Sequence, residues 1–195
     1  MDSDASRMVR AGIALGSNLG DRISNICAAR DLLRKLKPGE SACIQAPIYR
    51  SSPVNCPENS PDFFNTVVEI NYSGTPARLL EQTQAIEVEL GRIPGRPPNS
   101  PRVIDLDILY MGEYITDSDN LLIPHPRMTQ RRFVMQPLSD IRPSMTLPGD
   151  SVSVIEHLRS LPGDEAQLWA AYDFVHYVLH TVDQYLTEDF VVHVE

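Results

Sequence analysis

Residues 63–91 read FFNTVVEINYSGTPARLLEQTQAIEVELG, a stretch in which two patterns follow one another directly. Side chains of residues 63–72 alternate with a period of two, which predicts a strand. Beyond it, Thr75 suits a helix N-cap, Pro76 suits the first helical position, and Gly91 follows the predicted helix end. The expected buried stripe of this helix consists of Leu79, Thr83, Ile86 and Leu90. The stretch therefore predicts a strand that leads into a packed helix.

The segments on either side extend this unit into a longer order. The same periodicities predict a strand at 8–15, a helix at 21–36, a strand at 43–50 and a strand at 103–111. Strand, helix, strand, strand, helix, strand is the order of the split βαβ pattern. The predicted fold class is therefore α+β, a ferredoxin-like βαββαβ sandwich with an additional C-terminal helical segment.

The C-terminal part of the chain is less regular. We expect a loop at 117–128, short helical segments at 134–140 and 152–161, and a helix at 166–186. We accordingly expect one domain over residues 1–148 and an acidic, helical extension over residues 149–195.

Charge and composition exclude several classes of protein. The 195 residues carry a net charge of -9, of which residues 151–195, with eight acidic residues and one basic residue, contribute -7. A generally basic nucleic-acid binder is therefore excluded. No apolar run approaches the roughly 18 residues that a membrane span requires, and residues 1–10 lack the apolar centre of a secretion signal. Since Cys27, Cys43 and Cys56 also lack metal-ligand spacing, we expect a cytoplasmic protein without nucleic-acid or membrane partners.

Asp105 and Asp107 form the first group that could carry chemistry. Residues two apart on a strand point to the same face, with Cα atoms roughly 6.6 Å apart. Carboxylates this close repel one another unless a cation, a proton or arginines lie between them. One interpretation is a magnesium site that substrate phosphates complete. The alternative is a solvated strand face.

Several cationic side chains flank the predicted loops near this strand. They are Arg92, Arg102, Arg131, Arg132 and His125. Permanent cations beside a carboxylate pair are typical of phosphoryl transfer, in which both kinds of group stabilise charge. Each one taken alone also fits a surface role. Gly16–Gly20 lacks the Lys-Ser/Thr ending of a phosphate loop, so we interpret that segment as a tight turn into the helix.

Phe63, Asn65 and Phe133 suggest a site for a flat heterocycle. Aromatic rings stack on the faces of such a ligand, and an amide offers both a donor and an acceptor to its edge. The alternative is that they are core aromatics and a turn amide.

Taken together, six pieces of sequence resemble the 6-hydroxymethyl-7,8-dihydropterin pyrophosphokinase family of folate biosynthesis. They are ALGSNLGD at 14–21, YRSSP at 49–53, DFFN at 62–65, IEVELGR at 86–92, PRVIDLDI at 101–108, and IPHPRM at 123–128 followed by Arg131 and Phe133. The resemblance spans about residues 8–148 in the correct order. It implies transfer of a pyrophosphoryl group from the co-substrate ATP to the pterin hydroxymethyl oxygen, with release of AMP.

The resemblance also implies a role for individual residues. Asp105 and Asp107 would hold two Mg²⁺ ions, and Arg92 and Arg102 would act as catalytic residues on the phosphates. The nucleotide site would comprise Gln84, Glu87, Ile108, His125 and Arg131. The pterin site would comprise Ser51, Pro53, Val54, Phe63, Asn65 and Phe133.

Two parts of the chain depart from the family pattern. Pro98, Asn99 and Ser100 stand where the family commonly has arginine, tryptophan and glycine in a loop that closes over both substrates, so we expect activity with weakened closure. The tail after Pro148 matches nothing in the family, and we expect it to dock on the core or to mediate self-association. The rival hypotheses are a kinase of a related pterin and a catalytically reduced protein that only binds pterin or nucleotide.

Overall fold

The computed structural model describes residues 7–36, 38–39, 41–53, 60–93, 95, 100–162 and 169–170. The first part of the chain contains β1 (Met8–Ser17), α1 (Arg22–Leu36), β2 (Cys43–Gln45), β3 (Tyr49–Ser51), β4 (Phe63–Ser73), α2 (Pro76–Glu89) and β5 (Asp105–Met111). The second part contains β6 (Thr116–Ser118), β7 (Leu121–Ile123), the 3₁₀ turn η1 (Met128–Gln130), α3 (Arg132–Ile141), α4 (Val154–Ser160) and β8 (Trp169–Ala170). The predicted order of the first six elements is confirmed, except that residues 43–50 form two short strands.

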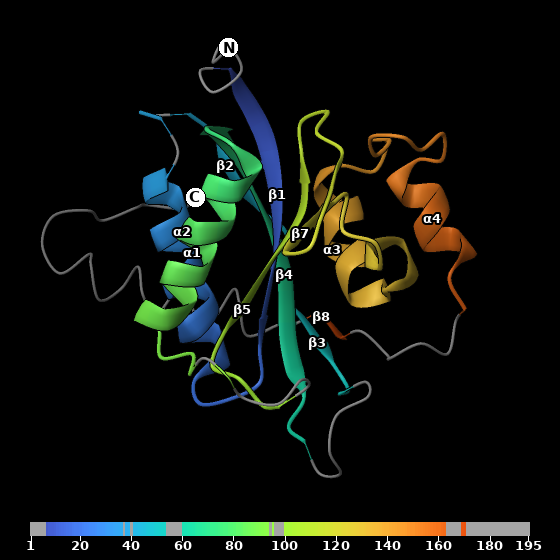
Figure 1. Ribbon diagram of the computed structural model, residues 1–195. Helices are drawn as coiled ribbons and strands as arrows, with labels where there is room; N and C mark the ends of the chain where they lie inside the picture. Colours follow the sequence, from blue (N-terminus) through green and yellow to red (C-terminus); the bar gives the residue numbers. More distant parts are fainter. Residues whose placement is uncertain are drawn as a thin grey trace, which may run out of the picture.

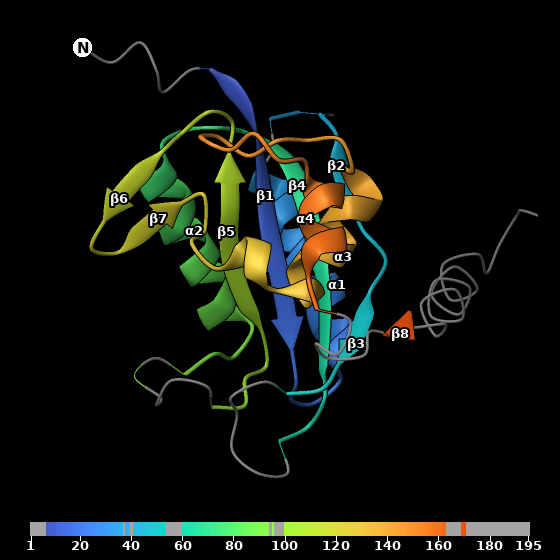
Figure 2. The same cartoon turned by 90° about the vertical axis from the view of Figure 1, so that its right-hand side faces the viewer.

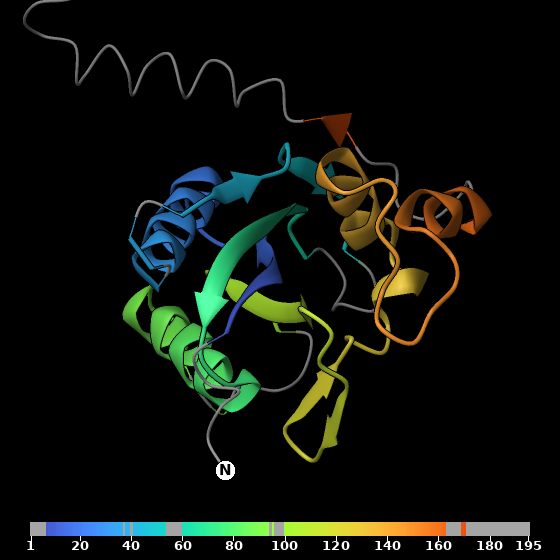
Figure 3. The ribbon, with the colours of Figure 1, turned by 90° about the horizontal axis from the view of Figure 1, so that it is seen from above.

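The main sheet is antiparallel, with the strand order β5-β1-β4-β3-β8 and with β2 also paired to β4. Helices α1 and α2 cover one face, while α3 and α4 lie on the other side (Figures 1 and 3). This arrangement confirms the ferredoxin-like α+β sandwich. The long strands β1 and β4 lie at its centre, so the chemistry-bearing ends of β1, β4 and β5 are neighbours.

Two hydrophobic clusters hold the layers together. The larger one joins the sheet to α1 and α2 and includes Ile13, Ile26 and Leu79. The second joins the opposite face to α3 and α4 and includes Val67, Leu138 and, from beyond residue 148, Val154 and Leu158. Helix α4, which lies beyond residue 148, thus shares a core with α3, while self-association through the tail stays a prediction.

Helix α2 begins and ends as its sequence predicts. The Thr75 side chain accepts a hydrogen bond of 3.2 Å from the backbone N–H of Arg78, with Pro76 in the first turn. Gly91, directly after the C-cap Leu90, has φ +96°, a conformation that glycine adopts without steric cost. The boundaries that place Glu87 and Arg92 beside β5 therefore arise from local capping.

Two predictions of secondary structure were wrong. The expected loop at 117–128 contains the hairpin of β6 and β7 (Figure 2), in which Ser118 pairs with Leu121 across a two-residue turn. The expected helix at 166–186 is wrong at Trp169–Ala170, which form β8 and pair with β3. Without β8, β3 would be an edge strand, and such a strand offers unpaired backbone groups to another segment. Residues 171–186 lie outside the described part. No helix among the described residues is long and apolar enough to cross a membrane.

Candidate active site

The register of three strands gathers the predicted site on one sheet face. Gly16 of β1 pairs with Asp105 of β5 on one side and with Asn65 of β4 on the other. Residues paired across neighbouring strands project to the same face. The two predicted halves of the site, carboxylates and heterocycle-binding amide, therefore lie on either side of one glycine.

The alternation within β5 follows the prediction. Asp105 and Asp107 are half-buried, whereas Leu106 and Ile108 lie in the core on the side of α1 and α2. The Ile108 side chain thus faces away from the carboxylates, and only its backbone is available to a ligand on their face.

Gly16 keeps the space between the two halves clear. A Cβ at this position would lie 3.2 Å from the Asn65 Oδ1 and 3.9 Å from a ring carbon of Phe63. The first distance is shorter than ordinary van der Waals contact, so a side chain here would press on the amide. Phe63 and Asn65 consequently border the same small area of sheet as Asp105.

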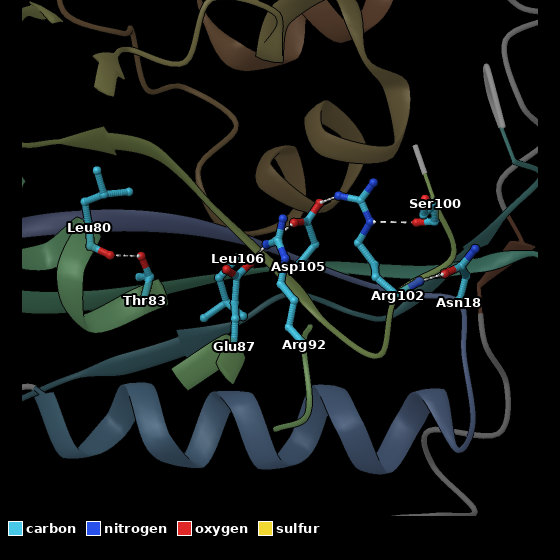
Figure 4. Close-up of polar contacts among 9 residues, drawn as sticks. All are labelled: Asn18, Leu80, Thr83, Glu87, Arg92, Ser100, Arg102, Asp105 and Leu106. Atoms are coloured by element: carbon cyan, nitrogen blue, oxygen red, sulfur yellow. Dashed lines mark hydrogen bonds and ion pairs between the residues drawn. The ribbon is translucent and has the colours of Figure 1, made fainter. Parts of the chain in front are cut away.

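Two arginines hold Asp105 from opposite sides (Figure 4). The Arg92 Nη1 lies 2.7 Å from one carboxylate oxygen of Asp105, and the Arg102 Nη1 lies 2.6 Å from the other. Arg92 also pairs with Glu87 of α2. Each oxygen of Asp105 therefore has a guanidinium partner, and both predicted catalytic arginines meet at a predicted metal ligand.

Glu87 connects α2 to the start of β5. Its Oε1 accepts a 2.7 Å hydrogen bond from the backbone N–H of Leu106, and only 5% of the residue is exposed. Burial raises the pKa of Glu87 to about 7, against the lowering effects of the Leu106 N–H and the Arg92 charge. Gln84, one turn earlier on α2, is exposed. Through these contacts, Glu87 holds the Arg92 side chain and the backbone at the start of β5 in place.

Asp107 completes a carboxylate pair whose chemistry fits a hard cation. Burial, followed by the neighbouring charge of Asp105, raises the pKa of Asp107, while Arg131, Arg102 and Arg92 act in the opposite direction. A divalent cation between the carboxylates would remove their mutual repulsion, and oxygen ligands are those that Mg²⁺ prefers. The residues present therefore fit a magnesium site.

His125 and Arg131 add further polar groups beside β5. The backbone N–H of His125 donates to the Leu109 carbonyl at 2.8 Å, and the Arg127 N–H donates to the His125 Nδ1 at 3.2 Å. Because Nδ1 accepts, a neutral ring carries its proton on Nε2. Burial, then Arg131 and Arg127, lowers the pKa of His125. The ring is therefore predominantly neutral at pH 7, and its Nε2–H is a donor that a ligand could use.

Arg131 lies among charges of both signs. Its pKa is lowered first by burial and then by the nearby charge of Arg127, while Asp107 and Asp105 act in the opposite direction. Its guanidinium carbon lies 5.5 Å from the centre of the Phe133 ring. Arg131 thus places a positive charge near both carboxylates and beside a predicted aromatic residue of the site.

The predicted heterocycle site is partly assembled by β3 and β4. The Asn65 Nδ2 donates a 2.8 Å hydrogen bond to the Ser51 Oγ, and both side chains are buried. Pro53, Phe63 and Phe133 are half-buried. Val54 lies outside the described residues, as do Pro98 and Asn99 of the departing loop.

Asn18 is a site residue that sequence reasoning missed. It is 1% exposed, and its Oδ1 accepts a 2.7 Å hydrogen bond from the backbone N–H of Arg102. The predicted turn into α1 begins at Asn18, because Gly16 and Ser17 still belong to β1, and Asn18 also fixes the backbone of Arg102, a predicted catalytic residue. An asparagine directly after a strand and before a helix was the available signal.

The fold and site define a class: a ferredoxin-like α+β domain that presents paired carboxylates and arginines beside a polar and aromatic surface. The family described as 7,8-dihydro-6-hydroxymethylpterin-pyrophosphokinase (HPPK) matches residues 12–143, and the chain belongs to this family.

Two bacterial relatives resemble much of the chain. A 2-amino-4-hydroxy-6-hydroxymethyldihydropteridine pyrophosphokinase of Pseudomonas aeruginosa is 40% identical over 139 residues, which are 71% of this chain and 84% of that protein. Its counterpart in Bacillus subtilis is 42% identical over 131 residues, covering 67% of this chain and 77% of the relative.

Some other matches are to much longer proteins. The folic acid synthesis protein fol1 of Pneumocystis carinii is 37% identical over 150 residues, 76% of this chain, but the match spans only 20% of that relative. The crystal structure of an HPPK-DHPS in complex with substrates superposes with a TM-score of 0.60 at 14% identity, over 79% of this chain and 43% of the other. The latter similarity shows the fold alone.

Proposed function

We propose that this chain transfers the pyrophosphoryl group of ATP to 6-hydroxymethyl-7,8-dihydropterin, giving AMP and the pterin diphosphate in folate biosynthesis. The observation that carries the proposal is the row of paired residues Asp105, Gly16 and Asn65. It places a carboxylate held by two arginines across one glycine from a fixed amide, as adjoining phosphate and heterocycle sites require. Membership of the family and the names of the bacterial relatives support the same reaction.

The reaction joins the pterin hydroxymethyl oxygen to the β-phosphorus of ATP. The bond from that phosphorus to the α,β-bridging oxygen breaks, AMP departs with the bridging oxygen, and the hydroxyl proton is released. Negative charge accumulates on the departing AMP and on the transferred phosphates. Positioning and charge neutralisation therefore account for most of the catalysis.

Dependence on Mg²⁺ is part of the proposal. Asp105 and Asp107 would hold two ions together with the phosphates, as their oxygen ligands and shared face favour. Bound there, the ions would neutralise phosphate charge and acidify the hydroxyl nucleophile. Since both oxygens of Asp105 are engaged by Arg92 and Arg102, these arginines would turn from the carboxylate to the phosphates when nucleotide binds.

The positions of His125, Arg131, Gln84 and Glu87 suggest how each would act on the nucleotide. His125 offers its Nε2–H, and Arg131 supplies a positive charge that would pair with a phosphate of the nucleotide. Gln84 is exposed on α2 and is available for a direct contact, whereas Glu87 acts by holding Arg92 and the start of β5.

The pterin side is built around a fixed amide. Because the Asn65 Nδ2 is engaged by Ser51, its Oδ1 is the atom presented toward Gly16. That oxygen would accept a hydrogen bond from an N–H on the pterin edge. Phe63 and Phe133 would stack on the ring faces, with Pro53 and Val54 completing the site.

The test combines protein, Mg²⁺, ATP and the pterin, and follows AMP by chromatography. AMP that forms only with pterin and Mg²⁺ together supports the proposal. Binding of both ligands without AMP would favour the catalytically reduced protein. That alternative is considered because residues 98–100 depart from the family pattern. AMP that forms faster with another pterin alcohol would favour the related kinase.

Two further proposals concern the chain as a whole. We propose a cytoplasmic location, because the three cysteines of the sequence are an odd number and lack metal-ligand spacing. We also propose that the acidic tail mediates self-association. Truncation after Pro162 that leaves the sedimentation coefficient unchanged apart from the lost mass would refute self-association.

A further inference from the structure

Asn18 forms a closed pair of hydrogen bonds with Arg102. The Asn18 Oδ1 accepts from the Arg102 backbone N–H at 2.7 Å, and the Asn18 backbone N–H donates to the Arg102 carbonyl at 3.2 Å. One residue directly after β1 thereby fixes both polar backbone groups of Arg102, and Figure 4 shows the bond that its side chain makes. A side chain on a backbone held at both groups has fewer accessible positions.

The same side chain also reaches the segment that enters β4. The Asn18 Nδ2 lies 3.5 Å from the Pro61 carbonyl, two residues before Phe63. Asn25 of α1 supports this junction, since its Nδ2 lies 2.9 Å from the Leu19 carbonyl and 3.2 Å from that of Val103. Asn18 therefore joins the segment that carries Arg102 to the segment that leads to the aromatic and amide groups.

We propose that Asn18 is a positioning residue that sets the spacing between the phosphate side and the pterin side of the active site. The proposal rests on the function proposed above. Arg102 and Asp105 belong to the phosphate side, while Phe63 and Asn65 belong to the pterin side. In-line transfer requires the two substrates within about 3–3.5 Å of one another, and a misplacement of about 1 Å costs about 100-fold in rate. Each substrate contacts mainly its own side, so loosening the junction slows transfer more than it weakens binding of either substrate alone.

The chemistry of an amide explains why an asparagine serves here. Its oxygen accepts from Arg102 while its nitrogen faces the Pro61 carbonyl. Asn18→Ala removes both contacts. Asn18→Asp keeps an acceptor for the short bond to Arg102, but it puts a carboxylate oxygen in place of the Nδ2 donor and so breaks the link to Pro61. The two variants therefore separate loss of the link alone from loss of both contacts.

The experiment compares both variants with the wild type and with Ser24→Ala, a control that removes an exposed 2.8 Å hydrogen bond to Asp21 at the start of α1. We would measure kcat, KM for each substrate, the dissociation constants of the pterin and of Mg²⁺ with α,β-methylene ATP, and the thermal midpoint. The methylene analogue binds without being cleaved at the reacting bond. The thermal midpoint reports any general loss of structure.

For Asn18→Ala we expect kcat to fall about 10- to 100-fold, while each dissociation constant changes by less than about threefold. Asn18→Asp should also lower kcat, because it loses the link to Pro61, and Ser24→Ala should match the wild type. The proposal is overturned if Asn18→Ala keeps its kcat, if ligand binding weakens as much as kcat falls, or if Asn18→Asp keeps the wild-type kcat. A wild type that releases no AMP would instead refute the proposed function.

Discussion

Replacing Asp105 should lower the rate of AMP formation much more than it lowers the free energy of unfolding. In Asp105→Asn, the amide oxygen can still accept one hydrogen bond, but the charge that faces Arg92 and Arg102 is lost. The side chains of Arg92, Arg102 and Asp105 are 35%, 22% and 23% exposed, so solvent screens both ion pairs. Pairs of this kind each contribute about 0.2–1 kcal/mol, which makes the expected loss of unfolding free energy about 1–2 kcal/mol at most.

The expected loss of activity is much larger. Removing one group that stabilises developing charge typically lowers kcat about 100- to 1000-fold, and Asp105 would also hold the metal. We therefore expect AMP formation to fall by at least that factor, with a fold that stays intact at 25 °C. AMP would be followed by chromatography over a range of Mg²⁺ concentrations, and stability by urea unfolding without metal.

A matched control isolates the site. Asp31→Asn removes an ion pair of 2.9 Å with Arg30 on α1, whose partner side chains are 24% and 54% exposed, and it should leave AMP formation unchanged. An Asp105→Asn enzyme that forms AMP at the wild-type rate would show that the metal assignment is wrong. A variant that is largely unfolded in buffer would instead refute the small stability contribution derived for these partly exposed ion pairs.

Three other predictions concern the framework around the site. Burial raises the pKa of Glu87 from 4.5 to about 7, so the free energy of unfolding should fall by up to about 3 kcal/mol as pH rises from 4.5 to 7. In Glu87→Gln, the part of the pH dependence of the urea midpoint that comes from this group should disappear. Arg142→Ala removes the cation that contacts the buried Glu69 carboxylate at 2.5 Å, so the free energy of unfolding should fall by about 3 kcal/mol. Adding Glu69→Gln should restore part of that loss, and no recovery would contradict the role of the buried charge. Gly12→Ala places a Cβ 2.2 Å from the Tyr110 ring and should cost about 1–3 kcal/mol in the same assay, whereas an unchanged midpoint would show that the ring moves freely.

Local patterns were sufficient for most of the fold. The N-cap at Thr75, the glycine after α2 and the alternation of β4 are properties of neighbouring residues, and the structure reproduces them. Of the two errors, the β6–β7 hairpin is a local pairing across a two-residue turn, whereas β8 depends on a distant partner. β8 joins the edge of β3, more than a hundred residues away, and helical periodicity in its own sequence carries no information about that partner.

The sequence by itself determined which residue types are present for the chemistry: two carboxylates two positions apart on a strand, arginines in the flanking loops, and an asparagine between aromatic and apolar residues. It also determined the family, since six pieces occur in the right order. Only the tertiary structure decided that Gly16 lies between Asp105 and Asn65, that two arginines share Asp105, and that Asn18 fixes Arg102. These contacts arise from strand register and loop packing, which depend on the burial of whole faces, so the one-dimensional order of residues leaves them open.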